Sequence, residues 1–351
     1  MNSQAEVTQP AVDVKFLSND RAQDWDKFVM GFKEATFFHL SGWRRILEDV
    51  FGYRCLYLFC ENSGEIQGVL PLVHFHNFIA GNTLVSTPFL VYGGAVGTDS
   101  SVVQALVEKA CEMAEEMAVD YLELRNLEPL AGEWETKDLY VTFRKEISSC
   151  SETNLAQIPR KQRAVVRKGI KAELDTNWQA DVERFYRVFS ESYRNLGTPI
   201  FHRKLFHKIM DEFGDYCQIT TIGKNGRDLS SVLSFVFRNE VIPYYGGGVD
   251  EARRWHANDY MYWAVMQRAA TSGISVFDYG RSKVGTGSFR FKKHWGFTPL
   301  PLNYQYKLIR SRELPDISPN NPKFSLPIAI WKKLPLSVTK SIGPFIAKRV
   351  G

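Results

Sequence analysis

Apolar and polar positions follow one another in the same order in the two halves of this chain. In the first half, three stretches with the pattern of strands lead to a Tyr-Gly-Gly motif at Tyr92; they span residues 55–60, 65–73 and 83–89. In the second half, three such stretches lead to the same motif at Tyr245; they span residues 217–222, 229–237 and 241–244. Tyr92 and Tyr245 are 153 positions apart, which indicates an internal repeat.

Each Tyr-Gly-Gly motif is followed by a helical stretch and then by another strand. The helices are expected over residues 101–118 and 259–271, each opened by a polar pair that can cap it, Asp99/Ser100 and Asn258/Asp259. The strands that follow, at 121–124 and 276–279, keep an offset of 155. This order predicts an α/β (α+β) fold of two similar domains with a shared cleft as the ligand site, unless two ordinary α/β halves match by coincidence.

The expected domain boundaries follow from the repeat and from the charge pattern. They are 1–153 for the N-terminal domain, 154–180 for a basic linker helix, 181–310 for the C-terminal domain and 311–351 for a basic amphipathic tail.

The end of the second repeat carries the strongest chemical signal. A half-buried strand ending at Asp278 runs into a loop in which Gly280, Gly285 and Gly287 permit tight turns. Five cations follow within 13 positions: Arg281, Lys283, Arg290, Lys292 and Lys293. Such a loop suits an acidic or oxyanionic ligand, although a solvated basic loop is the simpler alternative. It lacks the Gly-Lys-Ser/Thr of a nucleotide P-loop.

A second basic segment, residues 159–171, separates the two halves and contains no acidic residue. In a helix that starts after Pro159, one face would carry Arg160, Arg163, Arg167 and Lys171. An anionic partner would offset their repulsion: the phosphates of a lipid-linked or nucleotide-linked sugar, or of tRNA. The alternative is a solvated linker helix.

Composition bounds the class of protein. The chain has 351 residues, of which 44% are hydrophobic, enough for two globular domains. The net charge of +5 is modest, so we expect no DNA partner. Five cysteines show no paired metal-ligand spacing, and the first residues have no basic, apolar leader, so we expect a reduced, cytoplasmic protein without a metal site.

Several motifs resemble one transferase family. Asp278–Lys283, Gly285–Gly287 and Phe291–Phe297 resemble the closing motif of the FemAB-like transferases, which are relatives of the GNAT acyltransferases. Phe38–Trp43 resembles the family's N-terminal aromatic motif. Gly197-Thr198-Pro199 and the C-terminal Leu-Pro-Leu and Ile-Gly-Pro resemble its exopolysaccharide-associated, PEP-CTERM-linked branch. The resemblance implies two tandem GNAT-like domains that transfer an acyl or aminoacyl group to an amine of a cell-envelope or exopolysaccharide precursor.

Acyl transfer to an amine needs a positioned donor, a route for the amine proton and positive charge for the oxyanion. No nucleophile motif is evident, so direct transfer is expected. Asp278 is the candidate proton acceptor; alternatively it is a structural partner of Arg281 or Lys292. The resemblance implies that Lys292 stabilises the oxyanion, with Lys293 as the fallback.

The other candidate substrate-binding residues come from both halves. They are His39, Trp43, Tyr92, Arg160, Arg163, Arg167, Thr198, Tyr245, Arg281, Lys283, Arg290 and Lys293. For the histidine and the aromatic residues, the alternative is an ordinary packed or hydrogen-bonded role.

The acyl donor is left open between aminoacyl-tRNA and acyl-CoA, and no resident cofactor is expected. GNAT enzymes seat the CoA pyrophosphate on a glycine-rich loop at a helix N-terminus, whereas residues 250–259 contain no glycine. This absence weakens acyl-CoA as the donor. The acceptor is expected to be an anionic sugar or lipid-linked precursor. A non-catalytic binding module of the exopolysaccharide machinery is the alternative from another class.

The tail after Asp316 contains no acidic residue and six cations among apolar residues and prolines. It favours either a segment lying on an anionic membrane surface, at the inner face of the cytoplasmic membrane, or a strap packed across both domains.

Overall fold

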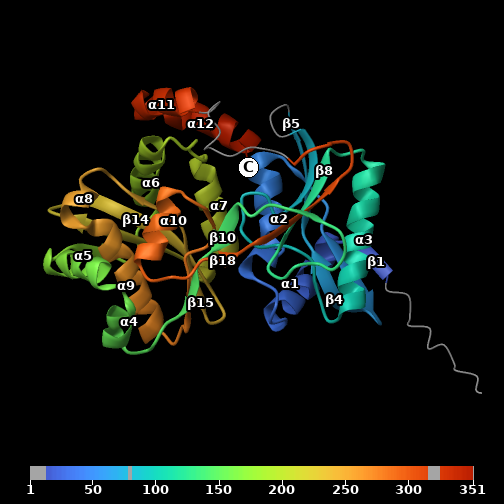
Figure 1. Ribbon diagram of the computed structural model, residues 1–351, viewed down its shortest axis with the longest axis horizontal. Coiled ribbons are helices and arrows are strands. Elements are labelled where there is room, and N and C mark those ends of the chain that lie inside the picture. Colours follow the sequence, from blue (N-terminus) through green and yellow to red (C-terminus); the bar gives the residue numbers. More distant parts are fainter. Residues whose placement is uncertain (1–12, 78–80, 315–324, 351) are drawn as a thin grey trace, which may run out of the picture.

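The computed structural model describes residues 13–77, 81–314 and 325–350, and it contains two α/β halves side by side (Figure 1). The first half lies on the right in Figure 1. Its elements are β1 (Asp13–Phe16), η1 (Asn19–Arg21), α1 (Ala22–Gly31), η2 (Phe37–His39), α2 (Gly42–Ile46), η3 (Leu47–Phe51), β2 (Arg54–Cys55), β3 (Leu58–Asn62), β4 (Glu65–Leu70), β5 (Leu72–Asn77), β6 (Gly81–Ser86), β7 (Val96–Gly97), α3 (Ser100–Glu116), β8 (Tyr121–Asn126), β9 (Glu135–Thr136), β10 (Tyr140–Thr142) and β11 (Arg144–Glu146).

The second half begins with a helical pair and ends with the tail helices. Its elements are α4 (Ser151–Gln157), α5 (Arg160–Lys171), β12 (Asp175–Asn177), α6 (Val182–Leu196), α7 (Arg203–Phe213), η4 (Gly214–Tyr216), β13 (Cys217–Lys224), β14 (Arg227–Phe237), β15 (Glu240–Gly248), α8 (Ala252–Trp255), α9 (Ala257–Thr271), β16 (Val276–Asp278), β17 (Ser282–Lys283), α10 (Gly287–His294), β18 (Leu300–Pro301), β19 (Asn303–Leu308), α11 (Ser325–Lys333) and α12 (Leu336–Val350).

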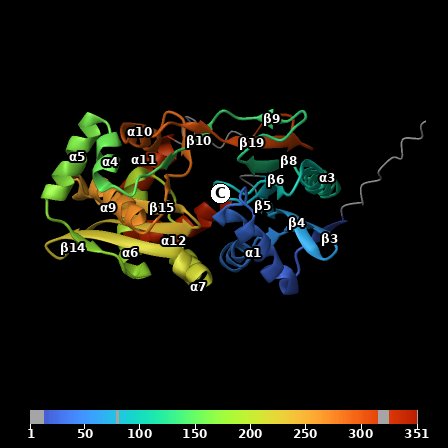
Figure 2. The same ribbon diagram turned by 90° about the horizontal axis from the view of Figure 1, so that it is seen from below.

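The predicted repeat is confirmed by the sheets. In the first half, β5 pairs antiparallel with β6, α3 crosses over, and β8 returns parallel to β6. In the second half, β14, β15, α9 and β16 repeat these steps in the same order. Figure 2 shows α6 and α7 on one face of the second sheet and α5, α9 and α10 on the other. The fold is therefore two tandem GNAT-like units, as expected.

Local sequence signals account for several helix boundaries. The Asp99 carboxylate accepts hydrogen bonds from the backbone N–H groups of Ser101 and Val102, which confirms it as the cap of α3. Helix α5 starts directly after Pro159, as predicted. Helix α9 starts two residues before the expected position, because His256 adopts a left-handed conformation with φ 54° and ends α8 there. Asp259 therefore lies inside the first turn of α9.

The two halves exchange one strand each. β19, from the end of the second half, pairs with β8 in the first sheet over six residues, whereas β11, from the end of the first half, pairs with β16 in the second sheet. The predicted boundaries at residues 153 and 310 therefore do not separate the two sheets. The physical reason is that a strand pairs with the open edge that lies nearest in space, and sequence patterns do not encode which edge that is.

An aromatic core joins the halves. Phe37 stacks on Phe235 with ring centroids 4.5 Å apart, and Trp43 packs on Phe213 at 5.0 Å. The first pair of rings comes from η2 and β14, and the second from α2 and α7. One continuous cluster of buried side chains therefore runs through both halves. Large apolar rings dominate this interface, which is typical of a permanent association.

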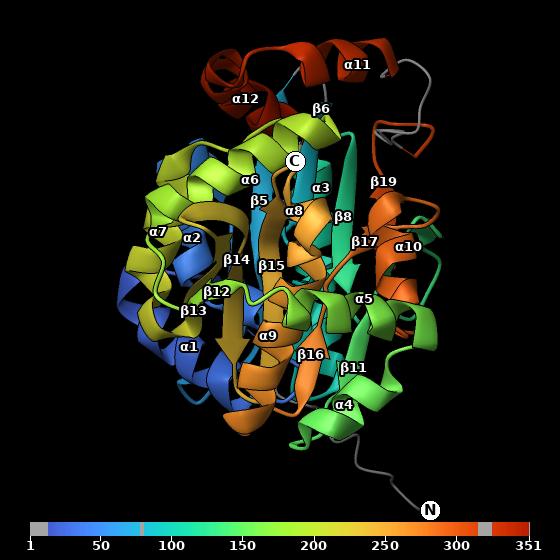
Figure 3. The ribbon, with the colours of Figure 1, turned by 90° about the vertical axis from the view of Figure 1, so that its left-hand side faces the viewer.

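The tail helices α11 and α12 pack over α6 at one end of the molecule (Figure 3). Arg194 of α6 donates a hydrogen bond to the Leu334 carbonyl, and the hydroxyl of Tyr53, in the first half, donates to the Lys348 carbonyl. The tail therefore straps both halves together. Within the described ranges, no helix is both long and apolar enough to cross a bilayer.

Candidate active site

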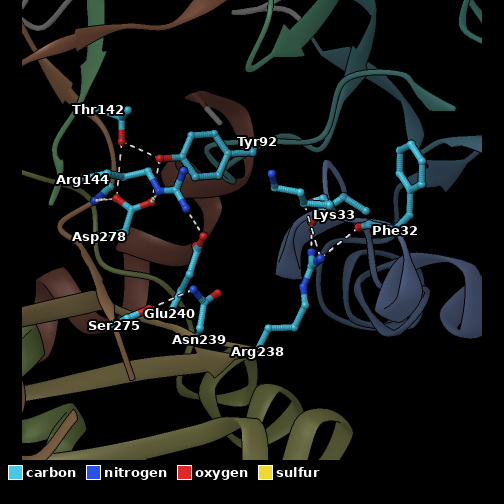
Figure 4. A network of polar contacts seen from close by, with 12 residues as sticks. Phe32, Lys33, Tyr92, Thr142, Arg144, Arg238, Asn239, Glu240, Ser275 and Asp278 are labelled. Carbon is cyan, nitrogen blue, oxygen red and sulfur yellow. Dashed lines mark hydrogen bonds and ion pairs between the residues drawn. The ribbon is translucent and has the colours of Figure 1, made fainter. Parts of the chain in front are cut away.

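Asp278, the candidate proton acceptor, lies at the end of β16 with a fully buried carboxylate (Figure 4). One carboxylate oxygen accepts from the Tyr92 hydroxyl at 2.8 Å, and the other accepts from the Gly280 backbone N–H at 2.6 Å. The guanidinium of Arg144, on the exchanged strand β11, lies 3.5 Å away, and Thr142 completes the shell. Desolvation raises the pKa of Asp278, while Arg144 and the Tyr92 hydrogen bond oppose the shift.

This network ties the halves together. It joins the loop after β6, β10, β11 and β16, and Arg144 also pairs with Glu240 of β15. The expected structural partners of Asp278 were Arg281 or Lys292, but the contacting cation is Arg144. Every oxygen of Asp278 already has a protein partner and no part of it is exposed. A role as proton acceptor stays a prediction, and it would require one of these partners to move.

Lys292, on α10, points inward beneath the loop that follows β16. Its ammonium donates to three backbone carbonyls, those of Tyr279 at 2.7 Å, Gly280 at 2.9 Å and Arg281 at 3.0 Å. An ammonium has three N–H donors, so none is left for a substrate oxyanion in this conformation. Burial lowers the pKa of Lys292 to about 7, whereas the three carbonyl acceptors favour its charged form.

Arg281 is the cation at this boundary whose donors are least engaged. Its guanidinium lies over the rings of Tyr140 and Tyr304, at 4.6 and 5.8 Å, and donates to the Tyr304 hydroxyl at 3.3 Å. No ion pair with a carboxylate is found for it among the described residues. A guanidinium has five N–H donors, so Arg281 retains capacity for an oxyanion between the two halves.

The loop of residues 87–94, after β6, lies between the halves and is held through its carbonyls. Thr87 and Phe89 adopt positive φ values of 48° and 68°, which side-chain-bearing residues seldom tolerate. Six carbonyls of this loop accept hydrogen bonds from side chains: Thr87 and Leu90 from Arg125, Phe89 from Tyr244, Val91 from Tyr304, Tyr92 from Thr87, and Gly94 from His39. The loop is thus a preorganised connection rather than a mobile flap.

His39 and Trp43, two candidate substrate contacts, are both buried. The backbone N–H of Thr36 donates to Nδ1 of His39, so Nε2 carries the proton that bonds the Gly94 carbonyl. Burial lowers the pKa of His39 to about 4, which keeps the ring neutral. The Trp43 indole donates to the Phe37 carbonyl. These contacts are those of the alternative interpretation, in which both side chains are packed and hydrogen-bonded within the protein. Contact with a substrate stays a prediction.

The Tyr-Gly-Gly tyrosines differ from each other. The Tyr92 hydroxyl reaches Asp278, whereas Tyr245 packs edge-on against Phe206 and Phe189 inside the core. The neighbouring Tyr244 is the extra residue of a β-bulge in β15, since Leu233 pairs with Tyr245 while Ser234 pairs with Pro243. The paired part of β15 and β16 is only two residues long, so the strands separate before this bulge.

The remaining candidates are spread over the surface. Lys283, on β17, lies over the Tyr140 ring, near Arg281. Arg290 and Lys293 are exposed on α10, and Arg290 bonds the Gly285 carbonyl. Thr198 is exposed after α6, next to Gly197, which faces Ile328 of the tail. The contacts therefore place Tyr92, Arg281 and Lys283 around the boundary, but not Thr198.

Arg160, Arg163 and Arg167 line a separate groove of about 490 Å³ along α5. The rest of its lining is Ala164, Lys168 and Lys171, all from the same helix. Neither Lys283 nor Lys292 lines this groove. Val166 and Gly169 dock α5 on the second half, which turns the charged face outward, whereas Lys292 turns inward. None of the ion pairs found within the described ranges includes a cation of α5.

The described residues hold no group of three His, Cys, Asp or Glu side chains able to bind a metal ion. Their five cysteines are free thiols.

Sequence reasoning missed several residues of the boundary. Arg144, Thr142, Tyr140 and Tyr304 come from the exchanged or connecting strands, and no pattern predicted their partners. Glu123 could have been found, because the offset of 155 aligns it with Asp278. Its buried carboxylate pairs with Arg125 at 2.7 Å, so the parallel strand of each repeat carries a buried, arginine-paired acid at the equivalent position.

Comparison with known proteins defines the class. Residues 154–293 match the family model of an acetyltransferase (GNAT) domain. No curated protein matches the sequence of the chain. The protein is therefore an acyltransferase whose second half carries a GNAT domain.

Solved structures extend the likeness to the tandem arrangement. A crystal structure of FemX is 14% identical and has a TM-score of 0.64, covering 85% of this chain and 98% of FemX. A tandem GNAT protein from the clavulanic acid biosynthesis pathway is 10% identical, with a TM-score of 0.54 and coverage of 84% and 97%. A conserved protein of unknown function from Bacteroides thetaiotaomicron is 11% identical, with a TM-score of 0.55 and coverage of 85% and 99%. At these identities the likeness is one of fold.

Proposed function

We propose that the protein is a FemAB-like transferase that moves an acyl or aminoacyl group directly to an amine of a cell-envelope or exopolysaccharide precursor in the cytoplasm. The amine attacks the acyl carbonyl carbon, the new C–N bond forms, and the bond from the carbonyl to the donor oxygen or sulfur breaks. The amine proton passes to the leaving group. Positive charge near the carbonyl oxygen stabilises the tetrahedral intermediate.

The basic groove on α5 is the observation that carries this proposal. Five cations line it without an acidic partner. The helix packs on the first turn of α9, because Gly169 faces Tyr260 and the His256 carbonyl, and Gln162 bonds Asp259. In a GNAT domain, donor phosphates lie near the N-terminus of the crossover helix. The groove therefore suits a polyanionic donor that approaches α9 from outside, and an anionic sugar or lipid-linked acceptor suits Arg281 and Lys283.

Aminoacyl-tRNA fits this arrangement better than acyl-CoA. Asp259 lies in the first turn of α9, where a pyrophosphate would meet its carboxylate, and it is held by Gln162 and Trp295. Desolvation raises the pKa of Asp259, although the Trp295 and Gln162 hydrogen bonds oppose this. A carboxylate at that position repels a diphosphate, whereas the groove on α5 offers a row of cations for a phosphodiester backbone.

Arg281 is the group that we assign to the developing oxyanion. The three N–H donors of Lys292 are engaged, while Arg281 makes a single hydrogen bond to a phenol. Lys292 then acts as a positioning residue, because it fixes the backbone of residues 279–281 from which Arg281 projects. Tyr140 and Tyr304 orient the guanidinium from the first half.

Two alternatives rest on specific observations. The family match to acetyltransferases favours an acyl-CoA-dependent N-acyltransferase. The complete engagement of Asp278 and Lys292 by protein groups favours a non-catalytic binding module of the exopolysaccharide machinery. The acceptor class and the PEP-CTERM branch rest on the resemblance of Gly197-Thr198-Pro199 and the tail motifs.

The donor is tested by binding and transfer with aminoacyl-tRNA and with acetyl-CoA. The wild type is expected to bind aminoacyl-tRNA with an affinity that falls steeply with salt. Changing Arg160, Arg163 and Arg167 to Gln should weaken this binding at least 10-fold. The slope of the logarithm of the affinity against the logarithm of the salt concentration should become shallower by the amount expected for about three lost phosphate contacts. Transfer of the labelled aminoacyl group to an amino-sugar acceptor is the activity readout.

A matched control carries the same loss of charge elsewhere. Lys27, Arg54 and Arg227 are also exposed cations, and their change to Gln should leave binding within about twofold. Saturable acetyl-CoA binding that the α5 variant leaves unchanged would replace the proposal by the acyl-CoA alternative. Binding of both donors without transfer of either would favour the binding module.

A further inference from the structure

The tail helices carry two apolar stripes, of which only one is used to hold them to the protein. Trp331 on α11 and Thr339, Gly343 and Ala347 on α12 are buried. Gly343 approaches the backbone of Ile200 so closely that an added Cβ would lie 2.8 Å from the Ile200 carbonyl oxygen. These residues recur every four positions on α12 and define its docked side.

The second stripe faces away from the protein. Its members are apolar and exposed, at up to 68% for Leu326 and 67% for Phe345, and we call them the tail face: Leu326, Ile330, Val338, Ile342 and Phe345. Each of Ile330, Val338 and Ile342 directly precedes a buried residue, so these three side chains are turned about 100° from the docked side. Five large apolar side chains exposed within 20 positions exceed the scattered exposure that a soluble surface requires.

The charged side chains of the tail helices themselves have one sign. Lys332, Lys333 and Lys348 are exposed, and Arg349 is partly exposed. The sequence after Asp316 contains no acidic residue. A second copy of the chain fits poorly on this surface, because a self-complementary interface would bring the same cations together. An anionic surface with an apolar layer beneath it matches both features.

We propose that the tail face lies on an anionic membrane surface, with its five apolar side chains inserted at the headgroup level and its cations at the lipid phosphates. The docked side keeps α11 and α12 attached to both halves while the tail face is inserted. The strap and the membrane contact, expected above as alternatives, are then two sides of the same helices. This contact is independent of the transfer reaction.

Vesicle flotation with the full-length protein tests the proposal. The wild type is expected to bind vesicles of phosphatidylcholine with 30 mol% phosphatidylglycerol at low salt, to bind at least 10-fold more weakly at 0.5 M salt, and to ignore pure phosphatidylcholine. The double variant Ile342→Ser, Phe345→Ser should lose at least 10-fold in affinity at every salt concentration. Lys332→Gln with Lys333→Gln should weaken binding mainly at low salt.

Matched controls separate insertion from folding. Ser337 and Ser341 are exposed on α12, and their change to Ala should leave vesicle binding unchanged. Thermal melting should be the same for all variants, because none of the changed side chains is buried. RNA binding by the α5 groove should also persist in the Ile342/Phe345 variant. A loss of vesicle binding alone would therefore leave the proposed transfer reaction unaffected.

Three results would overturn the proposal. They are no binding to anionic vesicles at low salt, equal binding to neutral vesicles, and full binding by the Ile342/Phe345 variant. Capture of an acidic protein partner by the wild type and not by this variant, without vesicle binding, would assign the tail face to that partner instead.

Discussion

At the residue scale, the boundary between the halves is organised by buried charges whose partners come from the other half or from an exchanged strand. Asp278 accepts from Tyr92 of the first half and lies beside Arg144 of β11. Burying a charge is tolerated only where partners satisfy it, so these contacts fix how the halves meet. Substitution of such a residue leaves its buried partners without a hydrogen bond or ion pair, so these positions should be sensitive to substitution.

Lys292→Met is expected to act on stability first. The substitution leaves three carbonyls without their donor, and each buried unsatisfied group costs about 1–3 kcal/mol. The midpoint of thermal unfolding should fall by several degrees, measured by circular dichroism. The exposed neighbour Lys293→Met is the control and should melt like the wild type. A variant that melts normally and still loses activity would instead support a role of Lys292 in stabilising the oxyanion.

The same pair of proteins tests the pKa of Lys292. Because burial lowers its folded pKa to about 7 from 10.5, the unfolded chain binds more protons between these values. The free energy of unfolding of the wild type should therefore rise with pH from about 7 to 10.5 relative to Lys292→Met. Denaturant titrations at several pH values measure the difference. If the difference in the free energy of unfolding did not change with pH, the carbonyl acceptors would be keeping the pKa of Lys292 in the folded protein near its ordinary value.

Arg281→Met should act on turnover instead. If its guanidinium faces the oxyanion, its loss should lower kcat about 100-fold with little effect on KM. Arg290→Met, on the exposed side of α10, is the matched control and should stay within twofold. Transfer assays with the donor and acceptor identified by the binding experiments give the rates. A rise in KM at constant kcat would make Arg281 a binding residue only.

At the element scale, α5 is held in place by a close contact that only glycine allows. A Cβ on Gly169 would lie 2.9 Å from the Tyr260 Cβ and 3.2 Å from the His256 carbonyl oxygen. Gly169→Ala should therefore destabilise the protein by about 1–3 kcal/mol through overpacking and should also weaken RNA binding by shifting the groove. Helix propensity alone would predict the opposite sign for stability.

Gly287→Ala is the control for this prediction. Gly287 also lies in a helix, α10, but nothing is found within 4 Å of the position of its added Cβ. Its substitution should leave stability unchanged or slightly raised. Urea titrations of both variants measure the difference, and equal stabilities would show that α5 adjusts to the added methyl group.

At the scale of the whole molecule, the exchanged strands predict that neither half folds alone. Residues 1–153 lack β19, which covers the edge of β8, and residues 154–351 lack β11, which covers the edge of β16. Each isolated half should expose an unpaired strand edge and part of the shared aromatic core, and should aggregate. Size-exclusion chromatography of each half, alone and co-expressed, tests this. A monomeric, cooperatively melting isolated half would contradict it.

The tail adds a second constraint at this scale. Truncation after Arg310 would remove the tail and, with it, the proposed membrane contact. The contacts of α11 and α12 with Arg194 and Tyr53 show that truncation would also remove a strap between the halves. Surface substitutions on the tail face are therefore the cleaner test of membrane contact.

The sequence by itself determined the repeat and most of its elements. Alternating apolar positions, the cap at Asp99, the helix start after Pro159, and the offset between Tyr92 and Tyr245 are local or periodic signals. Backbone geometry converts them directly into strands and helices. The resemblance of the closing motif led to the GNAT domain that the family match supports. The basic character of α5 and of the tail was likewise visible in the chain.

Only the tertiary structure decided which groups meet. The same closing motif that marked Asp278 and Lys292 does not say that Arg144 would cross from β11, or that Lys292 would bond three carbonyls of its own loop. The choice of partner depends on which strand edge is open and which face of a helix is docked, and both are set by long-range packing. For the same reason the two apolar stripes of the tail could not be told apart until one of them was found buried.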